Sequence, residues 1–135
     1  MKLFPESMLN SETLSLDSIK ARLNYFELQI HELHWQTANN AEHLALGDLY
    51  NTVFSMKDDI VEEMMGYTGV KTRAMPVAPI KNYEVLSPNQ VVDDLISFSR
   101  LLQSFGENNN MPDIGNLAQS LGGAAAKVKN RLTRD

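Results

Sequence analysis

The sequence contains no cysteine, so the disulfide framework of a small secreted domain is not possible. It also lacks any apolar run near the ~20 residues that a transmembrane helix needs. The first residues, MKLFPESML, lack the long apolar stretch of a signal peptide. These absences together predict a soluble, cytoplasmic protein with no membrane partner.

An excess of basic residues is missing as well. Lys and Arg number 12 against 17 Asp and Glu, which gives a formal net charge of -5 and a sequence pI near 5.1. Binding to a nucleic-acid backbone needs clustered cations, and the first fifteen residues contain only Lys2. The C-terminus is locally basic through Lys127, Lys129, Arg131 and Arg134. We therefore expect nucleic-acid binding to be weak or absent.

What the sequence does contain is helical periodicity. A length of 135 residues suits one domain, residues 1–135, with a single core. Four stretches repeat apolar side chains at steps of three and four, which is typical of amphipathic helices. They span approximately residues 16–35, 41–67, 88–105 and 112–132.

The segments between these helices set the fold. Residues 1–15 show no sustained periodicity and are expected to form an arm. Residues 70–87 contain Pro76 and Pro79 and are expected to form a crossover. Short, long and short connections predict an all-α, ferritin-like four-helix bundle with a long crossover between the second and third helices.

Glycines and caps predict several helix boundaries. Gly69 and Gly106 are expected to end the second and third helices, and Ser87 is expected to cap the start of the third. The pair Gly122-Gly123 lies inside the fourth helix, where each glycine costs roughly 1 kcal/mol relative to alanine. This pair therefore predicts close backbone approach to a neighbouring helix.

Several large apolar side chains do not belong to the predicted core. They are Leu28 and Trp35 in the first helix and Phe54, Val61 and Met65 in the second. A small bundle has one core, so this second apolar surface needs another partner, and exposed apolar patches usually mark interaction sites. We therefore expect a homo-oligomer built on dimers, with Trp35 as an interface anchor.

The residues that suggest chemistry fall into two clusters. His34 and His43 flank the turn TANN, whereas Asp58 and Glu62 lie well down the second helix. About fifteen helical residues separate His43 from Asp58, or roughly 22 Å at 1.5 Å per residue. One metal ion therefore cannot touch both clusters within one chain, but a two-fold dimer can join the corner of each chain to the carboxylates of the other.

The order His34-Trp35, His43, and then Asp58 with Glu62 in DDIVEEMMGYTG resembles the signature of the Dps-type mini-ferritins. The resemblance implies a ferroxidase centre between subunits, with two histidines from one chain and the two carboxylates from the other. It implies Fe(II) as the iron substrate, peroxide or dioxygen as the oxidant, and possible storage of ferric iron inside a shell.

Two positions leave the ligand set open. The His-Trp dipeptide selects His34, but His31 lies twelve residues before His43, close to the family's spacing, so it is an alternative ligand. The family often has an acidic residue four after the second histidine, and Gly47 stands there. The neighbours Asp59 and Glu63 are expected to face solvent.

A second hypothesis needs no catalysis. The chain would then be a helical homo-oligomer that keeps the fold and the dimer surface, while the histidine corner binds zinc or no metal. Neutral imidazole suits zinc as well as iron, so the residue types do not separate the two hypotheses.

Overall fold

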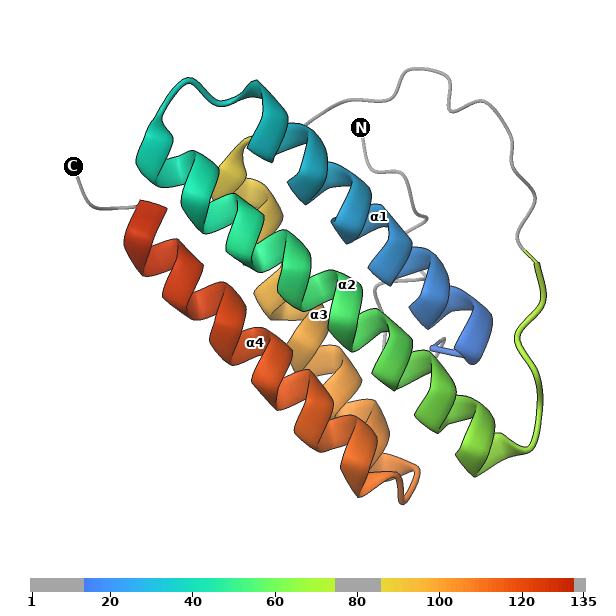
Figure 1. The fold of residues 1–135 in the computed structure, drawn as a ribbon. Coiled ribbons are helices and arrows are strands. Elements are labelled where there is room, and N and C mark those ends of the chain that lie inside the picture. The colour runs from blue at the N-terminus through green and yellow to red at the C-terminus, as the bar shows by residue number, and fades with distance from the viewer. Residues whose placement is uncertain (1–13, 75–85, 133–135) are drawn as a thin grey trace.

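The computed structural model describes residues 14–74 and 86–132, and these residues form four α-helices and no strand. The helices are α1 (Leu16–Gln36), α2 (Asn40–Thr68), α3 (Pro88–Asn108) and α4 (Pro112–Leu132). In Figure 1, α1 and α2 lie side by side, α4 lies beside α2, and α3 lies behind them. This arrangement confirms the predicted all-α four-helix bundle. None of the four helices combines the length and the apolar character that a membrane span requires.

Contacts between the helices fix their directions. Arg131 near the end of α4 pairs with Asp48 near the start of α2 (2.8 Å), and Tyr67 near the end of α2 donates to Asp113 near the start of α4 (3.1 Å). α2 and α4 are therefore antiparallel, and α4 is also antiparallel to α3 across a short turn. It follows that α2 and α3 run parallel. Most of the predicted arm and most of the predicted crossover lie outside the described residues.

The predicted helix boundaries are largely confirmed. Ser15 caps α1 through a reciprocal capping box with Ser18. Gly69 ends α2 in the left-handed conformation, with φ of 69°. Ser87 accepts a hydrogen bond from the backbone N–H of Gln90 at the start of α3 (3.3 Å).

The core contains the apolar positions that the periodicity predicted. Its largest fully buried side chains are Phe26, Phe98, Ile19, Leu23, Ile30, Leu46, Leu49, Ile60, Met64, Leu95, Leu102 and Ile114. Between α1 and α3 a charged group joins this core, because Arg22 is only 3% exposed and its guanidinium lies 4.5 Å from the ring centroid of Phe98. Between α1 and α3, the apolar stem of Arg22 and the ring of Phe98 therefore pack together as part of the core.

The predicted end of the third helix is wrong. α3 continues through Gly106 to Asn108, and the left-handed residue of the turn is Asn110, with φ of 58°. A Cβ atom on Gly106 would lie 2.6 Å from the backbone nitrogen of Gly115 and 2.8 Å from the carbonyl oxygen of Met111. Gly106 therefore permits close contact between α3 and α4 and does not end a helix.

Gly106→Ala should destabilise the protein by at least about 2 kcal/mol, because the added methyl group meets backbone atoms that cannot rotate away. Gly115→Ala is the matched control, since its Cβ would meet nothing closer than 3.6 Å. The control should be neutral or gain up to ~1 kcal/mol from helix propensity. Denaturant unfolding measures both variants, and equal stabilities would contradict the assigned close contact.

The Gly122-Gly123 pair divides into two roles. A Cβ on Gly122 would lie 3.2 Å from the Cβ of Ser99 in α3, so the predicted close approach is confirmed there. A Cβ on Gly123 would meet nothing within 4 Å, so the prediction is wrong for that residue. Gly123 instead borders an open groove between α2 and α4.

Candidate metal site at the histidine corner

The turn between α1 and α2 brings two histidines together. α1 ends at Gln36, and Asn39 caps α2 by accepting a hydrogen bond from the backbone N–H of Glu42 (3.1 Å). His34 therefore lies in the last turn of α1, and His43 lies in the first turn of α2. Their rings stack with centroids 3.8 Å apart and an interplanar angle of 16°.

Each histidine is held by the backbone of the other. His34 Nδ1 lies 2.7 Å from the carbonyl oxygen of His43, and His43 Nδ1 lies 2.8 Å from the carbonyl oxygen of His34. Because a carbonyl oxygen only accepts, both Nδ1 atoms carry a proton, and each neutral ring keeps its lone pair on Nε2. This is the arrangement that orients a metal-binding imidazole, in which one nitrogen is fixed and the other is available to a metal.

The same bonds stabilise the corner. The carbonyl of His34 is in the last turn of α1, where helix carbonyls have no intrahelical donor. The ring of His43 satisfies that carbonyl, and it also joins the start of α2 to the end of α1. The pair therefore has a structural role whether or not it binds a metal.

Gly47 makes room for His34. A Cβ on Gly47 would lie 2.9 Å from His34 Cε1 and 3.1 Å from His34 Nδ1. The imidazole therefore occupies the space that a longer side chain at this position would need. A larger residue at position 47, acidic or not, would therefore clash with His34 in this orientation.

His31 lies next to His34, with ring centroids 6.3 Å apart, and belongs to a partly exposed aromatic stack. Its ring centroid is 3.7 Å from that of Trp35 and 3.9 Å from that of Tyr50, and Tyr50 lies 6.2 Å from Phe54. Trp35 and Phe54 are 61% and 56% exposed. We call these four side chains, together with Leu28, the aromatic face. Sequence reasoning missed Tyr50, although its position seven residues after His43 places both on one side of α2.

The carboxylates lie apart from this corner. Asp58 and Glu62 are exposed and one helical turn apart on α2. Within residues 14–74 and 86–132, no three or more His, Cys, Asp or Glu side chains of one chain come close enough to hold a metal ion. The structure thus brings His34 to His43 and places Asp58 near Glu62, but it does not join the two pairs within a chain.

The prediction that Asp59 and Glu63 both face solvent holds for Asp59 and is wrong for Glu63. Glu63 is partly buried, and its Oε2 atom is buried without a hydrogen-bond partner among the described residues. Burial, and then the charges of Asp113 and Asp59, raise the pKa of Glu63. The charged form of Glu63 therefore opposes folding at neutral pH.

Glu63→Gln should raise the melting temperature at about pH 7, because it removes that unfavourable charge. The folded-state pKa of Glu63 lies above the unfolded one, so the destabilisation grows as pH rises from the unfolded pKa through the folded pKa. The gain should therefore fade below about pH 4, where Glu63 is protonated in both states. Glu62→Gln, at an exposed glutamate, is the control. Melting temperatures measured across this range should show the gain for Glu63→Gln only.

Comparison with known sequences gives one family. A family of unknown function (DUF5856) matches residues 34–132, from the histidine corner to the end of α4. Neither the curated proteins nor the solved structures contain a match to this chain.

Proposed function

Because the chain belongs to the DUF5856 family, whose function is unknown, we propose a function from its own residues: it binds Fe(II) between two copies of the chain and oxidises it. His34 and His43 of one copy would face Asp58 and Glu62 of the other. The oxidant would be peroxide or dioxygen. Further association of dimers into a shell would allow the ferric product to be stored.

The observation that carries this proposal is the orientation of the histidine pair. Reciprocal hydrogen bonds fix both Nδ1 atoms and leave both Nε2 lone pairs for a metal. Histidine nitrogens and carboxylate oxygens together suit ferrous iron. The pair alone supplies two nitrogens, so the remaining ligands would come from the exposed carboxylates of a partner chain.

The aromatic face supports the association of two copies. Trp35 and Phe54 are large and exposed, and the face extends along α1 and α2 between the histidine corner and Asp58. A two-fold axis through this face would pair α2 with its copy in the antiparallel direction, so that each histidine corner approaches the other chain's carboxylates. The same contact would thus bury the aromatic face and complete two equivalent sites.

The ring stack favours two iron ions per site. A metal bound to imidazole lies near the ring plane, about 2.1 Å from the nitrogen. The near-parallel planes of His34 and His43, with centroids 3.8 Å apart, do not share such a position. Each histidine would therefore bind its own ion. Two Fe(II) ions can then give one electron each to one peroxide, which takes up two protons and leaves as two water molecules.

The structural role of the histidine pair favours a second candidate. The reciprocal hydrogen bonds already satisfy the terminal carbonyl of His34 and join the two helices without any metal. The protein would then be a non-catalytic helical homo-oligomer whose corner binds zinc or no ion.

An iron titration separates the two candidates. Fe(II) is added anaerobically to the intact protein, peroxide or dioxygen is then supplied, and the near-ultraviolet absorbance of ferric iron is followed. The proposed function predicts oxidation much faster than in buffer alone, and inhibition by Zn(II) that competes for the histidines. Intact oligomers that do not accelerate oxidation would support the second candidate instead.

DNA is not a partner in this proposal. Of the basic C-terminal residues, Lys129 pairs with Asp93 (2.7 Å) and Arg131 pairs with Asp48 (2.8 Å). These ion pairs reduce the charge available to phosphates, so the expectation of weak or absent nucleic-acid binding stands.

A further inference from the structure

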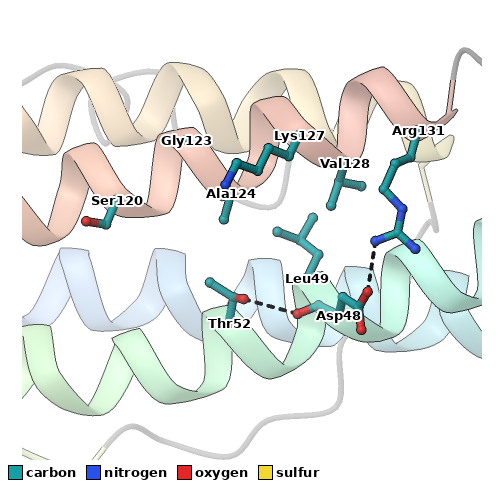
Figure 2. A pocket seen from close by; sticks show the side chains of 9 residues that line it. All are labelled: Asp48, Leu49, Thr52, Ser120, Gly123, Ala124, Lys127, Val128 and Arg131. Atoms are coloured by element: carbon teal, nitrogen blue, oxygen red, sulfur yellow. Dashed lines mark hydrogen bonds and ion pairs between the residues drawn. The ribbon is translucent and has the colours of Figure 1, made fainter.

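A groove lies between α2 and α4, and it is separate from the histidine corner. Its volume is about 530 Å³, and Figure 2 shows its lining side chains on the two facing helices. This volume is within the roughly 300–1,000 Å³ typical of small-molecule sites. The groove lies on the side of α2 that packs against α4, whereas the aromatic face lies along α1 and α2.

Small side chains open the groove. Gly123 borders it, and a Cβ there would meet nothing within 4 Å. Ser120 on α4 and Thr52 on α2 are the short side chains at the same level. The preceding residue, Gly122, packs against Ser99 of α3, so the two adjacent glycines serve different sides of α4. The open space is thus a consequence of residue choice on both helices.

The lining combines an apolar floor with a basic edge. Ala124 is partly exposed at its base, above the almost completely buried Leu49 and Val128. Lys127 and Arg131 lie one helical turn apart on α4. The protein carries a net charge of -5, so this pair of cations is a local exception. Among the described residues no ion pair engages Lys127, whereas Arg131 is held by Asp48 at 2.8 Å. Asp48 therefore competes with any anion for Arg131.

We propose that this groove binds a small amphiphilic anion, with its apolar body against Ala124 and the exposed edges of the groove floor, and its phosphate or carboxylate group bound by Lys127 and Arg131. Charge complementarity selects the anionic end, because charge-assisted hydrogen bonds are stronger than neutral ones. The apolar floor selects a molecule with a hydrocarbon part. The site uses no residue of the histidine corner, so it stands independently of iron oxidation.

Hexyl phosphate is a suitable probe, and calorimetry on the full chain measures its binding. We expect saturable binding, with chemical-shift changes at the amides of Thr52 and Gly123. Lys127→Met should weaken binding about tenfold, because it removes the charge and keeps the stem. Lys129→Met is the matched control, since Lys129 pairs with Asp93. The Lys129→Met variant should bind hexyl phosphate as tightly as the wild type does.

Two further variants test the geometry. Gly123→Leu should abolish binding by filling the groove, and circular dichroism verifies that the variant is folded. Asp48→Asn should tighten binding several-fold, because it releases Arg131. The affinities of hexanoate and hexyl phosphate are then compared. The probe that binds more tightly shows whether the groove prefers a carboxylate or a phosphate. Absence of binding by both probes, or equal binding by folded Gly123→Leu, would overturn the proposal.

Discussion

His34→Ala should abolish rapid Fe(II) oxidation, whereas His31→Ala should retain most of it. His34 shares a fixed, stacked arrangement with His43, and its Nε2 lone pair is available to a metal. His31 lies instead between Trp35 and Tyr50, where ring stacking accounts for its position. Loss of a metal ligand typically removes activity by orders of magnitude, so the two variants should differ clearly.

Stopped-flow oxidation rates compare these variants, and circular dichroism and mass in solution control for their folding and assembly. The control is needed because His34 also joins α1 to α2 through its hydrogen bond to the carbonyl of His43. If His31→Ala abolishes oxidation and His34→Ala does not, the spacing from His43 was the correct guide to the ligand, and the His-Trp dipeptide was not. Loss in both would show that both nitrogens bind, or that one orients the other.

We expect the protein to form dimers, and Trp35→Glu should convert them into monomers while most of the helicity remains. Trp35 is 61% exposed and anchors one end of the aromatic face, so a carboxylate there would have to be buried without a partner in the dimer. The core does not depend on Trp35, because it lies on the solvent side of α1. Iron oxidation should be lost together with the dimer, since each proposed site needs two chains.

Light scattering or native mass spectrometry measures this effect. Val70→Glu is the matched control, because Val70 is also 61% exposed but follows the end of α2, away from the histidine corner. The control should keep the oligomer and its activity. A wild type that is monomeric at micromolar concentration would contradict the dimer and with it the intersubunit site.

The fold could be predicted from the sequence because its signals are local. Apolar residues at steps of three and four mark the buried face of each helix, and Ser87 and Gly69 act on backbone groups within a few residues. Gly106 was misassigned because glycine marks both helix ends and close approaches. Its role depends on Gly115, which is brought near only by packing.

The candidate site was only partly predictable. A tight turn was enough to place His34 beside His43, but the reciprocal Nδ1 bonds depend on side-chain orientations that spacing does not determine. The roles of Gly47 and Tyr50 likewise arise from contacts between α1 and α2. The α2–α4 groove was missed because it is defined by what Gly123 lacks, and a missing side chain gives no periodic signal.

Mixed oligomers test whether each proposed iron site uses residues of two chains. One chain carries His34→Ala and His43→Ala, the other carries Asp58→Asn and Glu62→Gln, and each alone should be inactive. Random mixing in equal amounts makes about half of the dimers mixed, each with one intact site, so about one quarter of wild-type activity should return. If every site lay within one chain, the mixture would stay as inactive as its components, and that result would rule out a site shared between two chains.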